Sequence, residues 1–143
     1  MVQYRGAPTL AGYFTLANKY ISVSPKSISE TQRKRLRKFA MYDPRTKAYH
    51  LSAPLIAQLG KNYSNGYDSL LSGDEILSIA CDKVKGVQDV LGGRYVYLEC
   101  EDKPVLTEFY ARNGFCEFDR RKLDRDETDL EGDYLVQLLR YLK

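Results

Sequence analysis

Residues 50–75 have the sequence HLSAPLIAQLGKNYSNGYDSLLSGDE. The apolar run 51–59 predicts a strand in the middle of a sheet, and apolar residues recur at helical spacing from residue 76 to residue 90. The connection between these two segments is rich in glycine, asparagine and serine, which are turn formers. The stretch therefore predicts a buried strand, a polar turn and a long helix, and the other elements are interpreted around it.

This strand, turn and helix start have two interpretations. A strand that leads through a turn into a helix gathers unpaired backbone N–H groups and the positive end of the helix dipole at one point, which suits a phosphate. The alternative is that these polar residues have only the structural role of forming the turn. Ser72 and Glu75 then form an ordinary S-x-x-E capping box. The local sequence is compatible with both.

Length and composition set the broad class of the protein. The chain has 143 residues, of which 43% are hydrophobic, so we expect one core and a single domain, 1–143. No apolar run approaches the roughly 18 residues of a membrane span, and the N-terminus lacks a signal-peptide pattern. We therefore expect a cytoplasmic protein with no membrane partner. The formal charge of +3 is too small to indicate nucleic acid by itself.

Cysteine and histidine usage argues against several kinds of site. Cys81, Cys100 and Cys116 are widely separated in apolar-rich segments and have no metal-ligand spacing, so we expect three buried free thiols. His50 is the only histidine. A catalytic triad or a histidine-based metal site would have to depend on that residue, and we expect neither, nor any other metal site.

The remaining elements alternate between strands and helices. We expect an edge strand at 1–5 and a long strand at 9–23 with at most a bulge near Asn18. After the 76–90 helix we expect strands at 94–100, 115–122 and 134–142, and a helix at 104–114 that begins at Pro104 and ends at Gly114. Such alternation predicts an α/β fold in which helices pack on a mixed sheet.

Residues 26–47 form a basic insert before the central strand. A helix capped by Ser29 is expected there, ending before Pro44. The insert is either a solvated basic helix or an electrostatic guide for a polyanionic partner. Its basic side chains, set against Glu30 and Asp43 alone, are Lys26, Arg33, Lys34, Arg35, Arg37, Lys38, Arg45 and Lys47.

Five segments together resemble the GNAT superfamily of acetyl-CoA-dependent N-acetyltransferases. They are LAGYFTLA, APLIAQLGKN, SGDEIL, YVYLECED and FYARNGF, and in order and spacing they cover residues 9–142. FYARNGF is the sharpest match, because a helix ending in Y-x-x-x-G-F before a strand is common in this family. LAGYFTLA is similar to a bacterial branch that includes toxin-type enzymes acting on aminoacyl-tRNA. The resemblance implies a GNAT-like acyl-CoA N-acyltransferase fold with a mixed, mostly antiparallel central sheet.

The resemblance also implies a binding site for acetyl-CoA as cosubstrate. The usual Q/R-x-x-G-x-G/A motif is absent, and Asp74 stands near an expected glycine, where its carboxylate would repel a pyrophosphate unless it points away. By resemblance, the pantetheine arm would lie along Gln58, Leu59, Gly60 and Lys61. The pyrophosphate would bind at Leu71, Ser72, Gly73, Asp74 and Glu75.

The resemblance assigns the chemistry to Tyr110, which would protonate the departing thiolate as a general acid. The alternative is that Tyr110 packs beside Phe109 and Phe115 as part of the core. Glu99 or Glu101 would take the proton of the attacking amine, and alternation puts Glu99 on the face of Tyr95 and Tyr97. A backbone N–H near Leu59 or Lys61 would stabilise the oxyanion.

One departure from the family affects the expected assembly. Family members usually begin with a strand and two helices, whereas this chain has only about ten residues before the corresponding strand. We therefore expect a shortened domain that forms a homodimer.

Two functions follow from the resemblance. In the first, the protein is an N-acetyltransferase for a primary amine of a protein, a small molecule or an aminoacyl-tRNA. In the second, it is a non-catalytic GNAT-like module that associates with a polyanion, such as tRNA, through residues 26–47.

Overall fold

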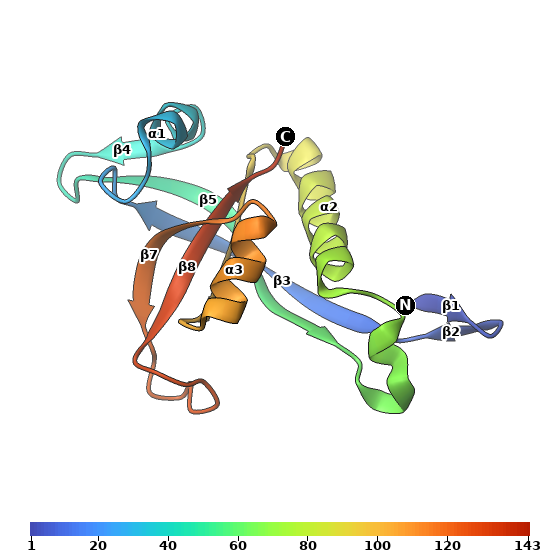
Figure 1. Cartoon of the computed structure of the whole chain (residues 1–143). Helices are drawn as coiled ribbons and strands as arrows, with labels where there is room; N and C mark the ends of the chain where they lie inside the picture. The colour runs from blue at the N-terminus through green and yellow to red at the C-terminus, as the bar shows by residue number, and fades with distance from the viewer.

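A computed structural model describes the whole chain, residues 1–143. Figure 1 follows its elements from the N-terminus to the C-terminus. They are β1 (Val2–Tyr4), β2 (Ala7–Thr9), β3 (Gly12–Val23), α1 (Glu30–Leu36), β4 (Met41–Asp43), β5 (Ala48–Lys61), the 3-10 helix η1 (Ser64–Ser69), α2 (Gly73–Leu91), β6 (Tyr95–Glu101), α3 (Pro104–Arg112), β7 (Cys116–Lys122) and β8 (Tyr134–Tyr141).

The main sheet has the strand order β3-β5-β6-β8-β7, and β4 adds to one edge of β5. Only β5 and β6 run parallel, while every other neighbouring pair is antiparallel. The predicted mixed, mostly antiparallel sheet is therefore confirmed. The final segment, expected to be a strand, is β8 and lies between β6 and β7.

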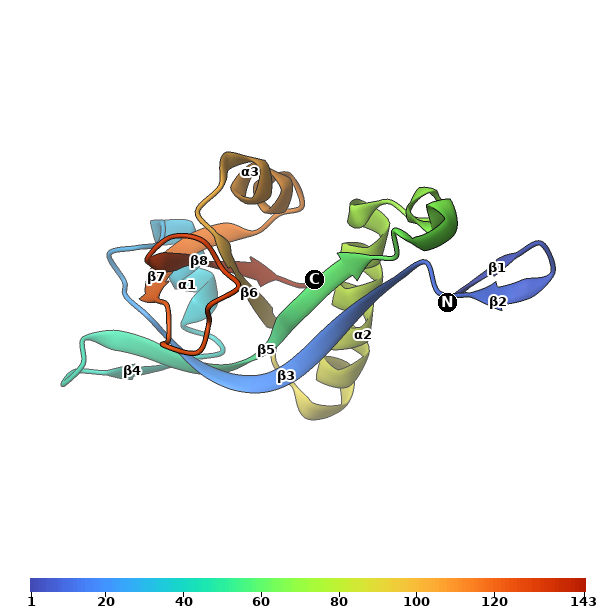
Figure 2. The ribbon, with the colours of Figure 1, turned by 90° about the horizontal axis from the view of Figure 1, so that it is seen from below.

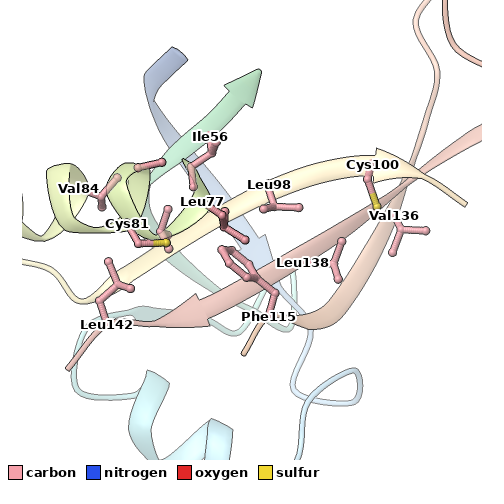
Figure 3. Close-up of a cluster of buried hydrophobic side chains, with 12 residues drawn as sticks. Ile56, Leu77, Cys81, Val84, Leu98, Cys100, Phe115, Val136, Leu138 and Leu142 are labelled. Atoms are coloured by element: carbon pink, nitrogen blue, oxygen red, sulfur yellow. The ribbon is translucent and has the colours of Figure 1, made fainter. Parts of the chain in front are cut away.

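Helices cover both faces of this sheet. On one face, Val96, Leu98 and Cys100 of β6 pack in a cluster that includes Leu77 and Val84 of α2 (Figure 3). The partly buried side chains of α3 pack against the same cluster. On the other face, the side chains of Tyr95 and Tyr97 share a second cluster that includes Leu36 of α1. Alternate residues of β6 therefore point to opposite faces, as the period of a strand requires.

The predicted long helix is α2, and its start is capped as expected. The Ser72 hydroxyl accepts a hydrogen bond from the Glu75 N–H at 3.1 Å, while the Glu75 carboxylate accepts one from the Ser72 N–H at 2.7 Å. These hydrogen bonds to Ser72 lower the pKa of Glu75. The capping box is thus a real structural feature, and it starts the helix three residues before the first periodic apolar position.

The N-terminal part of the chain differs from the prediction in its first residues. Residues 1–5 do not form an edge strand of the main sheet, because β1 pairs only with β2 in a separate hairpin. The 9–23 strand was expected to have at most a bulge near Asn18, and no bulge lies at that residue, since Asn18 pairs regularly with Pro54. The irregularity lies at Ala57 of β5, the extra residue opposite the step from Thr15 to Leu16. The sequence of one strand does not indicate which of two paired strands carries the extra residue.

The basic insert contains the predicted helix and one strand that was not predicted. The helix is capped by Ser29 and ends at Leu36, before Pro44, as expected. Leu36 is buried, so the helix is anchored on the sheet by an apolar contact rather than fully solvated. Residues 41–43 form the additional strand β4, because the chain returns to pair with the edge of β5.

Two of the three predicted buried thiols are confirmed. Cys81 and Cys100 are buried and free, whereas Cys116 is free but exposed, so that prediction is wrong for Cys116. It is the first residue of β7, the outer strand of the sheet. None of the helices combines the length and the apolar character that crossing a membrane requires.

Candidate active site

Strands β5 and β6 pair over a very short distance and then separate. Their register contains only Leu55 with Tyr97 and Ile56 with Leu98. Beyond Ile56, β5 continues to Lys61 along β3, but its other edge has no strand partner. The bulge at Ala57 lies where the two strands part, and Figure 2 shows β5 and β6 running in different directions. The free edge offers unpaired backbone N–H and C=O groups to an extended ligand.

A cavity of about 930 Å³ occupies the space where these strands part. Gln58 and Leu59 of β5 line it, together with Glu99 and with Tyr110 of α3. With Glu101, which also lines it, five of the predicted site residues are brought together around one cavity. Gly60 and Lys61 lie farther along the free edge and do not line it.

The end of β5 lies beside the first turn of α2. A Cβ atom built on Gly12 would lie 2.4 Å from Ile76 Cδ1 and 2.9 Å from the carbonyl oxygen of Gly60. Two adjacent strands and the helix start are therefore in close contact, and glycine is required at Gly12. The two halves of the predicted acetyl-CoA site, at the end of β5 and at the start of α2, are neighbours in the fold.

The start of α2 has free hydrogen-bond donors. The Glu75 N–H is taken by the Ser72 hydroxyl and the Ile76 N–H by the Ser72 carbonyl. The N–H group of Gly73 has no partner in the chain, and that of Asp74 has none beyond its own carboxylate. Two donors at the positive end of a 19-residue helix suit an anion.

The Asp74 carboxylate is engaged with α3. It accepts hydrogen bonds from Arg112 Nη2 at 3.0 Å and from Asn113 Nδ2 at 2.7 Å. Arg112, followed by Asn113, lowers the pKa of Asp74, so the carboxylate is ionised and paired. The repulsion that the sequence suggested between Asp74 and a pyrophosphate is therefore reduced by this pairing.

Tyr110 has the features of both of its predicted roles. Its ring packs edge-on against Phe109 and Phe115, with centroids 5.0 Å and 6.0 Å away. The same side chain also lines the cavity, and its hydroxyl has no hydrogen-bond partner in the chain. Burial raises the pKa of Tyr110 to about 12, so the phenol is neutral at physiological pH and can donate a hydrogen bond.

Glu99 reaches the cavity from the opposite face of β6. Arg121 Nε donates to both of its oxygens at 3.1 Å, and Gln137 Nε2 donates to Oε1 at 2.7 Å. Arg121 also donates to Glu127 at 2.8 Å. This network joins β6, β7, β8 and residues 123–133, so the Glu99 side chain is held firmly in place.

Glu101, the other predicted base, is engaged in a different way. Its Oε1 accepts a hydrogen bond from the Glu131 N–H at 2.7 Å, and its Oε2 lies 3.1 Å from Lys103 Nζ. The Glu131 hydrogen bond, followed by that of Lys103, lowers the pKa of Glu101. Glu101 therefore holds the segment before β8 in place.

Sequence reasoning did not identify Arg121, Glu127 or Gln137 as part of the site. They belong to an outer strand, to a polar segment and to an apolar strand, and none of them lies in a motif. Only the cross-strand register brings Gln137 opposite Glu99. His50 does not itself line the cavity, and its ring nitrogens are engaged by Ser22 at 2.8 Å and Thr46 at 2.9 Å.

Comparison with known proteins identifies the fold. No family model and no curated protein matches the sequence. A tyrosine-to-phenylalanine mutant of the toxin AtaT matches with 15% sequence identity and a TM-score of 0.54. The match covers 92% of this chain and 58% of the mutant's chain. A tyrosine-to-phenylalanine mutant of KacT matches with 17% sequence identity and a TM-score of 0.53. The match covers 89% of this chain and 61% of the KacT chain.

A third structure, described as a bacterial toxin, covers 89% of this chain and 58% of its own at 16% identity, with a TM-score of 0.52. The chain thus spans about three fifths of the length of each of these structures. At such identities the similarity concerns the fold. The chain shares its fold with these structures, and that fold is the GNAT-like acyl-CoA N-acyltransferase fold.

Proposed function

We propose that this protein is an N-acetyltransferase that moves an acetyl group from acetyl-CoA to a primary amine. The observation that carries the proposal is the separation of β5 from β6 after Ile56, which opens a cavity beside a free strand edge and next to Tyr110. The GNAT-like fold supports the same reaction class.

The proposed cofactor site has two parts. The amide groups of the pantetheine arm pair with the free edge of β5 over Gln58, Leu59, Gly60 and Lys61, as an added strand would. The pyrophosphate accepts hydrogen bonds from the N–H groups of Gly73 and Asp74. Leu71, Ser72 and Glu75 complete the turn around it.

The proposed chemistry uses both faces of β6. The neutral amine attacks the thioester carbonyl, and a backbone N–H near Leu59 or Lys61 stabilises the oxyanion. The carbon–sulfur bond then breaks, and the Tyr110 phenol gives a proton to the thiolate. Glu99 accepts the proton of the amine, directly or through a water molecule, and the products are an acetamide and free CoA.

The test is release of free CoA thiol from acetyl-CoA in the presence of a primary amine. The Tyr110→Phe variant should lose about a hundredfold in kcat while still binding acetyl-CoA. Glu99→Gln should also lower kcat. Tyr134→Phe is the matched control, because Tyr134 is half exposed and does not line the cavity. Unchanged turnover in Tyr110→Phe would remove Tyr110 from the mechanism.

A second candidate function is polyanion binding by the basic insert without catalysis. Arg33 pairs with Glu30 and Arg37 donates to Tyr49, but Lys34 and Lys38 form no ion pair and are free for a partner. The charge reversal of Lys34 and Lys38 together should weaken tRNA binding and reduce its salt dependence. Unchanged binding would exclude the insert as the contact surface.

A further inference from the structure

A row of polar side chains crosses three strands on the α1 side of the sheet. Glu99 of β6 lies opposite Gln137 of β8, which lies opposite Asp119 of β7. Directly paired residues of neighbouring strands share a face, and Tyr97, two residues before Glu99, lies on that face too. All four line the cavity. This face lies across β6 from Tyr110 and α2, where the cofactor is proposed to bind.

Tyr97 contributes to this row a hydroxyl group that makes no hydrogen bond within the chain. Its side chain is only 4% exposed, yet its hydroxyl makes no hydrogen bond in the chain and faces the cavity it lines. Burial, followed by the neighbouring Glu99 charge, raises the pKa of Tyr97 to about 12, so the hydroxyl keeps its proton. Water in the cavity can reach this hydroxyl, and a ligand that enters the cavity can replace that water as its hydrogen-bond partner.

The charges on this wall are mostly negative. Glu99, Glu101, Asp119, Asp124 and Glu127 line the cavity, against Lys19 and Arg121. The guanidinium of Arg121 is already paired with Glu99, Glu127 and Asp124. Asp119 has no ion pair and accepts only a local hydrogen bond from the Arg120 N–H. The cavity therefore presents uncompensated carboxylates to whatever enters from this side.

The chain segment that borders this side of the cavity adds further negative charge. Residues 123–133 contain six carboxylates and one arginine. Figure 1 shows this segment at one end of β7 and β8, and α1 with β4 at the other end. A wall of one charge sign concentrates ligands of the opposite sign and repels those of the same sign. The acidic end of the cleft is therefore unsuited to a polyanion.

We infer that the part of the cavity on the α1 side of the sheet, lined by Glu99, Gln137, Asp119 and Tyr97, is the acceptor subsite. It takes a small primary amine that carries a second positive charge. The reacting amine lies toward Glu99 and the gap between β5 and β6. The second cation lies near Asp119 and residues 123–133, and the Tyr97 hydroxyl accepts a hydrogen bond from the acceptor. This inference rests on the proposed acetyl transfer and names its substrate class.

Three four-carbon amines test the inference: putrescine, butylamine and γ-aminobutyrate. They share a primary amine but differ in the distal group, which is a cation, a methyl group or a carboxylate. The kcat/KM for acetyl transfer should be highest for putrescine, about tenfold above butylamine, and lowest for γ-aminobutyrate. The preference should shrink as salt rises. Equal values, or faster acetylation of an aminoacyl-tRNA than of putrescine, would overturn the inference.

Variants separate this subsite from the cofactor site. Asp119→Asn and Tyr97→Phe should each raise the KM for putrescine several-fold and leave acetyl-CoA affinity unchanged, and Asp119→Glu should restore most of the putrescine preference. Asp126→Asn is the matched control, because Asp126 belongs to the same acidic segment but does not line the cavity.

Direct binding keeps the test decisive if no amine is acetylated. Putrescine is then titrated into the protein and followed by NMR. Binding that weakens in Asp119→Asn supports the subsite, and the absence of binding overturns it. Acetyl-CoA binding is measured separately by calorimetry. A chain that binds acetyl-CoA but shows no preference among the three amines contradicts only the subsite, and a chain that binds putrescine but no acetyl-CoA contradicts only the proposed transferase function.

Discussion

The Asp74 carboxylate lies 3.0 Å from Arg112 Nη2, which ties the first turn of α2 to the last turn of α3. The pair is largely exposed, so its contribution to folding stability is small. Its larger effect is electrostatic, because it compensates a negative charge beside the N–H groups of Gly73 and Asp74 at the helix start. We expect Arg112 to reduce the repulsion between Asp74 and an anion bound there, at the position where the resemblance implies a glycine.

Removing Arg112 should therefore weaken cofactor binding more than folding. In Arg112→Ala the uncompensated Asp74 charge should lower acetyl-CoA affinity by on the order of fivefold, measured by calorimetry. The double variant Arg112→Ala with Asp74→Asn should recover most of the loss, since the repelling charge is gone. A double variant as weak as the single one would show that Arg112 acts in some other way.

A stability prediction concerns the contact between β3, β5 and α2. Gly12→Ala should destabilise the protein by about 1–3 kcal/mol, because the new Cβ would collide with Ile76 and with the Gly60 carbonyl. Gly86→Ala is the control. It adds a methyl group where nothing lies within 4 Å, inside α2, and should stabilise by about 0.5–1 kcal/mol. Urea unfolding of both variants measures the difference.

The Arg121 network predicts how stability depends on pH. Arg121 holds the pKa of Glu127 at about 2, below its ordinary value of 4.5. A depressed carboxyl pKa contributes stability that is fully present above the ordinary value and is lost as the pH falls through the folded one. The urea midpoint should therefore fall between about pH 5 and pH 2. Glu127→Gln should lower the midpoint at neutral pH and flatten this dependence, whereas Asp126→Asn should behave like the unmodified protein.

The pKa of Tyr110 predicts the alkaline side of the rate profile. Because burial raises it to about 12, the phenol stays protonated throughout the range in which substrate amines lose their protons. The kcat/KM should rise as the amine deprotonates and should not fall again before about pH 10. A descending limb near pH 8 that disappears in Tyr110→Phe would contradict this assignment, since it would place the tyrosine pKa far lower.

Much of this fold can be predicted from local patterns. Apolar periodicity and the Ser72–Glu75 capping box locate α2, Pro104 marks the start of α3, and alternation in 94–100 places Glu99 and Tyr97 on one face of β6. These features depend on residues close together in the chain. The predicted homodimer is not tested by one chain and stays a prediction.

The features of the fold and of the site that the sequence does not predict depend on pairing between strands that are distant in the chain. The bulge at Ala57, the return of β4 to β5 and the row from Glu99 through Gln137 to Asp119 are set by register, which no single segment encodes. Arg121 likewise lies in a charged strand whose sequence does not indicate its partners. The negative charge of the proposed acceptor subsite therefore depends on strand pairing, which the sequence alone does not indicate.

The most direct test of the central claim is acetyl-CoA binding to Gly73→Pro and Gly73→Ala, measured by calorimetry beside the unmodified protein. Gly73 is the first residue of α2, where proline fits a helix and removes the backbone N–H proposed to hold the pyrophosphate. The Cβ that proline adds, 3.3 Å from Phe109 Cε2, is also present in Gly73→Ala, which therefore controls for that contact. The unmodified protein and Gly73→Ala should bind with micromolar affinity, and Gly73→Pro should bind at least about tenfold more weakly. Equal affinity in all three proteins, or no detectable binding by the unmodified one, would contradict an acetyl-CoA site at the start of α2.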